Sequence, residues 1–159
     1  MKDNQSNLPT NMKILSLYGR SKKGKTLTLG ILAKLLQRIG QFTNKAPRRK
    51  KEVCGVFSIY NAQGKEIKVG LTTKGDDDIA LDYDFTLLGK CDLYVCASHL
   101  KGSTLTWLKA RTKNGYLLRL SKATVENMQG HVPNVATITE QAINTWQAEK
   151  LFEIVISLL

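Results

Sequence analysis

The residues best suited to chemistry lie in one short loop. Positions 19–26 read GRSKKGKT, which places Gly19, Gly24, Lys25 and Thr26 in the pattern G-x-x-x-x-G-K-T. Glycines let a backbone curl so that several N–H groups point inward, and a helix that follows adds its positive N-terminal end. The lysine would reach the β and γ phosphates of a nucleotide, and the threonine hydroxyl would ligate Mg²⁺. The pattern therefore predicts a phosphate-binding loop.

The sequence on either side supports this interpretation, because the motif requires a strand before the loop and a helix after it. The run KILSLYG at 13–19 is typical of a short strand, and from Thr26 onward leucines recur at the three-and-four spacing of a helix. The alternative is an ordinary glycine turn in which Lys25 opens a solvent-exposed helix. The expected nucleotide-binding residues are Gly19, Arg20, Ser21, Lys22, Lys23, Gly24, Lys25, Thr26 and Leu27.

Through GRSKKGKT and its strand–loop–helix setting, the chain resembles the P-loop NTPases, with a close match over about residues 13–39. A hairpin of the second and third strands is similar to the element order of small GTPases. Their D-x-x-G motif is replaced by TTKG at 72–75, and the nearest string to their N-K-x-D motif is TKNG at 112–115. The resemblance is nearest to small stand-alone bacterial P-loop proteins of unassigned chemistry. It implies Mg²⁺ and ATP as ligands, without excluding GTP.

A carboxylate that holds the metal is expected at the carboxyl end of a strand beside the P-loop. Asp76 follows the predicted strand 66–73 at that end, whereas Asp92 opens the predicted strand 91–98 and lies at the opposite end. We therefore expect Thr26 and Asp76 to bind the metal. The alternative is that the three aspartates at 76–78 cap the next helix. Both roles are compatible if Asp76 faces the metal while a later aspartate caps.

Three residues are the candidates for catalysis: Lys25, Asp76 and His99. His99 follows the predicted strand 91–98, where a polar side chain can orient an attacking water. The alternative is a surface histidine at a strand end. Arg111 and Arg119 could neutralise charge in the transition state, or lie on a solvated face.

Strands alternate with helices along the chain, which favours a three-layer α/β domain. The expected strands are 13–19, 54–60, 66–73, 91–98 and 116–120, and the expected helices are 26–39, 77–89, 103–113 and 139–159. The predicted fold is P-loop NTPase-like, with an about five-stranded, mostly parallel sheet, one hairpin and helices on both faces. Residues 1–12 are predicted to be a disordered tail before a single domain at 13–159, and 41–52 an exposed loop. Gly30 lowers helix propensity, and close packing against that helix would explain it.

Length and charge bound the function classes. The chain has 159 residues with 24 Lys and Arg against 13 Asp and Glu, which suits one globular domain. Its longest apolar stretch, 154–159, is far shorter than the ~20 residues of a membrane-spanning helix. The polar N-terminus fits neither a secretory signal nor a transit peptide, so we predict a cytoplasmic protein with no membrane partner.

The positive charge lies almost wholly in the first third, where residues 1–51 hold 13 basic residues and one acid. A segment of this region, KAPRRKK, predicts contact with nucleic acid or an acidic protein, and a solvated basic loop is the alternative. The residues expected to make that contact are Lys45, Arg48, Arg49, Lys50 and Lys51.

Together these patterns predict binding of Mg²⁺ and a nucleoside triphosphate, ATP rather than GTP, with slow hydrolysis or phosphoryl transfer. Two alternatives come from other function classes. One is a nucleotide-sensing interaction module with negligible turnover. The other is a basic protein that binds nucleic acid.

Overall fold

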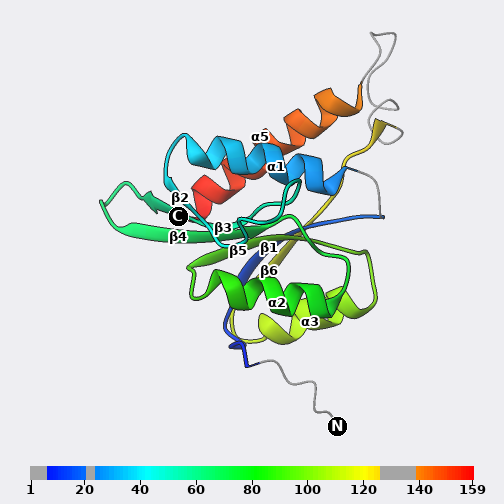
Figure 1. Ribbon diagram of the computed structural model, residues 1–159, viewed down its shortest axis with the longest axis horizontal. Coiled ribbons are helices and arrows are strands. Elements are labelled where there is room, and N and C mark those ends of the chain that lie inside the picture. The colour runs from blue at the N-terminus through cyan, green and yellow to red at the C-terminus, as the bar shows by residue number, and fades with distance from the viewer. Residues whose placement is uncertain (1–6, 21–23, 126–138) are drawn as a thin grey trace.

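The computed structural model describes residues 7–20, 24–125 and 139–159. This part of the chain is an α/β fold in which a mixed six-stranded sheet has helices on both faces (Figure 1). The strands are β1 (Lys13–Tyr18), β2 (Gln41–Asn44), β3 (Cys54–Tyr60), β4 (Glu66–Thr72), β5 (Leu93–Ser98) and β6 (Tyr116–Ser121). The helices are α1 (Lys25–Gln37), α2 (Asp78–Leu88), α3 (Ser103–Arg111) and α5 (Glu140–Leu158).

The sheet has the strand order β2-β3-β4-β5-β1-β6. The strands β4, β5, β1 and β6 run parallel to their neighbours, while β3 is antiparallel to both β2 and β4. This corrects the expected five-stranded sheet to a mixed one of six strands, with the predicted hairpin present as β3–β4. Because β4, β5 and β1 are parallel, their carboxyl ends meet at one edge of the sheet, where ligands of open α/β sheets bind.

The additional strand, β2, lies in the segment 41–52 that was expected to be an exposed loop. It pairs with β3, and the ring of Phe42 lies 4.7 Å from that of Phe57. Gly55 makes room for this contact, since a Cβ there would lie 2.3 Å from a ring carbon of Phe42. One aromatic side chain among polar neighbours carries no periodic signal, so tertiary packing creates this strand.

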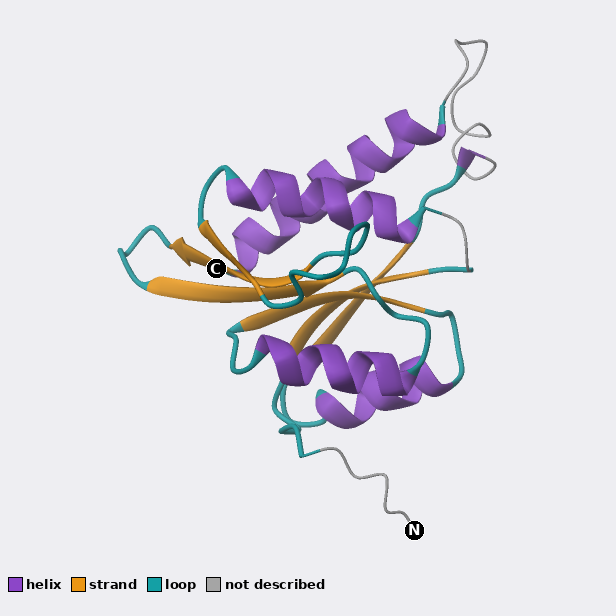
Figure 2. Cartoon of the chain, viewed as in Figure 1, coloured by secondary structure: helices purple, strands orange, loops and turns teal. Residues whose placement is uncertain are grey.

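Each face of the sheet closes with its own apolar core. The helices α1 and α5 cover one face, and α2 and α3 cover the other (Figures 1 and 2). Under α1 and α5 the buried side chains include Leu15, Leu17, Leu29, Leu32, Leu36, Leu151 and Val155. Under α2 and α3 they include Ile14, Leu81, Phe85, Cys96 and Leu108. Neighbouring β1 residues thus point to opposite faces, as the pleat of a strand requires.

The predicted N-terminal tail is shorter than expected at its C-terminal end. The backbone N–H of Asn114 donates to the carbonyl of Thr10 at 2.8 Å, and Met12 is buried under α2 and α3. These contacts fix residues that precede β1. Positions 1–6 of the predicted tail lie outside the described residues. No helix in the described ranges combines the length and the apolar character needed to cross a membrane.

Candidate phosphate-binding site

The start of α1 provides donors for an anion. Gly24 precedes the helix with φ of 87°, a left-handed conformation that favours glycine. No side chain caps α1 and its first turn has no acid, whereas Asp77 caps α2 and Thr139 caps α5. The first N–H groups of a helix lack acceptors within the helix, so this end attracts negative charge. Ser21, Lys22 and Lys23 of the predicted loop lie outside the described residues.

Lys25 joins the ends of two neighbouring strands. Its Nζ donates to the carbonyl of Gly19 after β1 at 2.5 Å and to that of Ser98, the last residue of β5, at 3.1 Å. The backbone N–H of Gly19 also donates to the Ser98 carbonyl, at 3.2 Å. Burial lowers the pKa of Lys25, while the nearby charge of Asp76 raises it. These contacts hold a cation at the sheet edge where the P-loop begins.

Asp76 reaches this edge by a route that the sequence does not indicate. We expected its strand to lie beside the P-loop strand, but β5 separates β4 from β1. The chain that leaves β4 crosses the end of β5, and Gly75 permits that crossing. A Cβ on Gly75 would lie 2.0 Å from the carbonyl oxygen of Ala97, so only glycine fits. The crossing brings Asp76 to the same pocket as Lys25 and Thr26.

The pocket has a volume of about 560 Å³. Its lining residues are Gly24, Lys25, Thr26, Leu27, Thr73, Gly75, Asp76 and Ala97. The described residues contain no group of three or more His, Cys, Asp or Glu that could hold a metal by themselves. Mg²⁺ needs no such group, because it keeps several waters and takes one or two carboxylates together with substrate phosphates. The hydroxyl of Thr26 and the carboxylate of Asp76 fit that requirement.

The aspartates at 76–78 have different roles. The carboxylate of Asp77 caps α2 by accepting from the N–H of Ala80 at 2.7 Å, while Asp76 is exposed at the pocket. The alternative carboxylate, Asp92, accepts from the N–H of Lys68 at 2.8 Å, just before the start of β5. Asp92 therefore lies at the edge of the sheet opposite the pocket.

His99 is not among the residues that line the pocket. Its N–H donates to the hydroxyl of Thr104 at 3.1 Å, and its carbonyl accepts from Arg119 at 2.9 Å. The Arg119 guanidinium lies 4.2 Å from the centre of the Tyr18 ring, so this arginine supports the loop after β5. Arg111 lies at the far edge, where its carbonyl accepts from the N–H of Met12, ahead of β1.

Two polar residues beside the loop were not found from the sequence. Lys122 is buried behind Gly19 and Gly24, next to the positions their Cβ atoms would take, and burial lowers its pKa. Asn144 of α5 is also buried, and its Oδ1 accepts from the hydroxyl of Thr28 at 3.2 Å. An apolar stripe predicts that Trp146 is buried there instead, yet it is 43% exposed. No sequence pattern marks either residue.

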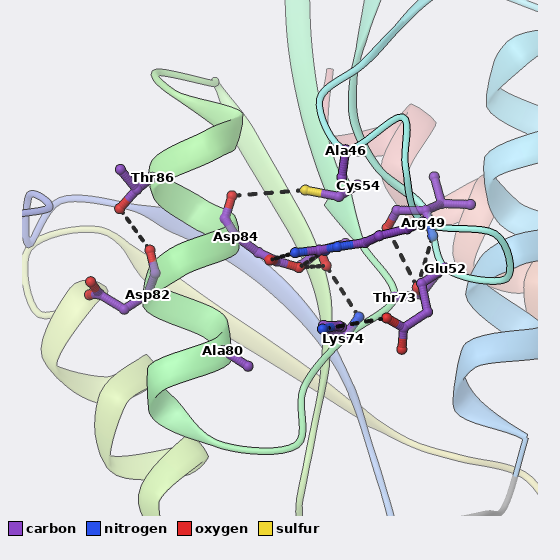
Figure 3. Close-up of polar contacts among 12 residues, drawn as sticks. Ala46, Arg49, Glu52, Cys54, Thr73, Lys74, Ala80, Asp82, Asp84 and Thr86 are labelled. Atoms are coloured by element: carbon purple, nitrogen blue, oxygen red, sulfur yellow. Dashed lines mark hydrogen bonds and ion pairs between the residues drawn. The ribbon is translucent and has the colours of Figure 1, made fainter.

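The basic segment is divided by an ion pair (Figure 3). Arg49 binds the buried carboxylate of Asp84 through two hydrogen bonds of 2.8 Å, and Thr72 donates to the same carboxylate at 2.5 Å. Arg49 is therefore a structural residue, which corrects its expected role in partner binding. The other four cations of the segment, Lys45, Arg48, Lys50 and Lys51, are exposed.

The same loop is tied to the strand end that precedes Asp76. The N–H of Val53 donates to the hydroxyl of Thr73 at 3.0 Å, and the N–H of Thr73 donates to the Val53 carbonyl at 2.9 Å. Figure 3 shows Arg49 reaching from this loop to α2, with Thr73 and Lys74 at the end of β4. The basic loop and the Asp76 loop are thus one connected structure.

We expect Asp84→Asn to lower the free energy of unfolding by about 2–3 kcal/mol, because it leaves Arg49 partly buried without its carboxylate. Asp82→Asn on the same helix removes the same charge and keeps an oxygen for its 3.1 Å bond from Trp107, so it should cost less than about 0.5 kcal/mol. Urea denaturation of both variants measures the difference. Equal destabilisation would contradict the structural role of the Arg49–Asp84 pair.

Comparisons with protein-family models, with curated proteins and with solved structures find no match for this chain. What bears on its function is the geometry of the site, in which an ammonium, a hydroxyl and a carboxylate line one pocket at the start of α1.

Proposed function

We propose that this protein binds a nucleoside triphosphate together with Mg²⁺, ATP in preference to GTP, and hydrolyses it slowly or transfers its terminal phosphate. One observation carries the proposal: Lys25, Thr26 and Asp76 line a single pocket at an uncapped helix start. The preference for ATP rests on the sequence, which lacks the guanine-reading signature. A P-loop NTPase-like fold is part of the same proposal, supported by the glycine loop between β1 and α1.

Each group would have a distinct role. The backbone N–H groups at the start of α1 would receive phosphate oxygens, and the Lys25 amine would turn from its two carbonyls to the β and γ phosphates. The Thr26 hydroxyl and the Asp76 carboxylate would hold Mg²⁺, which supplies charge neutralisation where negative charge develops on the transferred group. The N–H of Gly75 is available at the same pocket for the γ phosphate. His99 lies off the pocket, so it carries no step, which is consistent with slow turnover.

Lys25→Ala should weaken ATP–Mg²⁺ binding about 10- to 100-fold, because it removes a charged donor to the phosphates. Thr26→Ala should reduce the dependence of binding on Mg²⁺. Lys34→Ala is the matched control, since Lys34 is an exposed lysine of the same helix, and its affinity should stay within about twofold of wild type. Calorimetric titration tests all three. Equal affinity of wild type and Lys25→Ala would exclude the phosphate-loop assignment.

Asp76→Asn should reduce ATP turnover at least about tenfold and change nucleotide affinity less, since the metal contributes most where transition-state charge develops. Asp77→Asn is a matched control, because Asn caps a helix about as well as Asp. Steady-state phosphate release measures the effect, and Asp92→Asn should match wild type. If Asp92→Asn lost turnover while Asp76→Asn kept it, the choice of carboxylate would be wrong. Binding with no turnover in wild type would favour a nucleotide sensor over an enzyme.

A second candidate function, contact with nucleic acid or an acidic protein, is supported by the four exposed cations of the segment 45–51. Neutralising Arg48, Lys50 and Lys51 together should leave ATP affinity within about threefold, because Lys25 and the loop N–H groups dominate there. Any binding of RNA or DNA should fall sharply. Its dependence of log affinity on log salt should become shallower by about 0.9 per lost phosphate contact on duplex DNA and about 0.7 on single strands. Absence of retention by wild type at low salt would eliminate this function.

A further inference from the structure

A second, larger cavity adjoins the phosphate pocket. Its volume is about 800 Å³, and it shares Thr26 and Leu27 with that pocket. One wall is α1 from Thr26 to Gln37, and the others come from β2, β3, the loop between them and the start of α5. Cavities of about 300–1,000 Å³ are the size that holds small organic molecules. We call this cavity the α1 groove.

Gly30 lies in the middle of the α1 wall and has no structural reason to be glycine. We expected close packing against it, but a Cβ at this position would meet nothing within 4 Å. Its φ is not in the left-handed region, so the backbone does not require glycine. Glycine inside a helix weakens that helix relative to alanine. What its missing side chain does here is to leave the groove open.

The groove has an apolar interior and a cationic rim. Ile31, Phe42, Val53 and Phe57 supply apolar surface, and Leu27, where the two cavities meet, is 66% exposed. Lys34, Lys50 and Lys51 are exposed along the rim, and none of them pairs with a carboxylate of the described residues. Glu140 is the one acid that lines the groove. This arrangement suits an apolar body that carries a negative group.

The wall that carries two of these lysines is fixed in place. Lys50 and Lys51 lie between Arg49, which is bound to Asp84, and Val53, which is bound to Thr73. A pre-formed wall costs a ligand less ordering than a mobile one does. The groove is therefore held open from both sides, by the anchored loop and by the absence of a side chain at Gly30.

We propose that the α1 groove is a binding site for a small apolar anion, an aromatic or aliphatic molecule bearing a carboxylate, sulfonate or phosphate. The apolar part occupies the space over Gly30 between Ile31 and the aromatic pair, and the negative group lies at Lys50 and Lys51. This site goes beyond the proposed nucleotide site and does not depend on it. Its position makes the bound anion a neighbour of the phosphate pocket across Leu27.

The probe is 1-anilinonaphthalene-8-sulfonate, an aromatic anion whose fluorescence rises on transfer to an apolar site. We expect one probe bound per chain, displaced by decanoate and at least tenfold less effectively by decylammonium, which has the same chain length and the opposite charge. Equal displacement by the two would overturn the proposal, and so would the absence of a saturable site.

Variants locate the probe. Gly30→Leu should weaken it more than tenfold by filling the groove, while raising the thermal midpoint by about 2 °C through better helix propensity. Lys50→Ala with Lys51→Ala should weaken it about fivefold. The matched control is Lys109→Ala with Lys113→Ala, which makes the same charge change beyond the other face of the sheet and should leave affinity unchanged. Unaltered binding in Gly30→Leu would overturn the proposal.

Two further measurements separate this proposal from the nucleotide one. Lys25→Ala should bind the probe as wild type does, even though its ATP affinity falls, and Gly30→Leu should bind ATP within about threefold of wild type. If ATP bound neither wild type nor Lys25→Ala while the probe bound both, the nucleotide site would fail and the groove would stand. Loss of probe binding in Lys25→Ala, with an unchanged near-ultraviolet circular dichroism spectrum, would place the probe in the phosphate pocket and overturn the groove.

Discussion

The candidate site depends on one close approach between two backbones. Gly75 passes the carboxyl end of β5 so closely that a single added carbon would lie 2.0 Å from the Ala97 carbonyl oxygen. Without that approach, the strand order would keep Asp76 one full strand away from the P-loop, since neighbouring strands lie about 4.8 Å apart. Because parallel strands end at a common edge, the crossing needs only a short segment. A steric constraint at one glycine thereby sets which carboxylate faces Lys25.

The Arg49–Asp84–Thr72 cluster gives that crossing its support. Asp84 is buried on α2, so its charge must be paired, and both partners come from elements that border the candidate sites. Thr72 ends β4, three residues before Gly75, and Arg49 belongs to the loop that walls the α1 groove. The pair therefore fixes the Asp76 loop and the groove wall relative to the same helix. A buried ion pair contributes little net stability, but removing one partner is costly, which keeps the two loops together.

Local patterns account for much of the fold and for half of the site. The hairpin, the fully buried β5 and the helix starts at Asp77 and Thr139 follow from alternation, apolar runs and capping residues that act over a few positions. The strand β2 and the buried Asn144 do not, because each depends on a partner far along the chain: Phe57 for the first and Thr28 for the second. The sequence placed Asp76 at the correct sheet edge, but the position of β5 beside β1 is a property of topology. The same limit hid the role of Arg49, whose partner lies 35 residues away.

The positive charge of the first third of the chain separates into physically different groups. Lys25 is buried at the end of β5 and Arg49 is paired with a buried carboxylate, so solvent ions screen both weakly. Lys34, Lys50 and Lys51 stand exposed around an apolar groove, where their attraction for an anion is screened within about 10 Å at 0.1 M salt. An anion held only by exposed lysines would be lost as salt rises, whereas one that also buries an apolar body would retain that part of its binding. The apolar interior of the groove, rather than its charge, is therefore what makes it selective for a molecule over a bare ion.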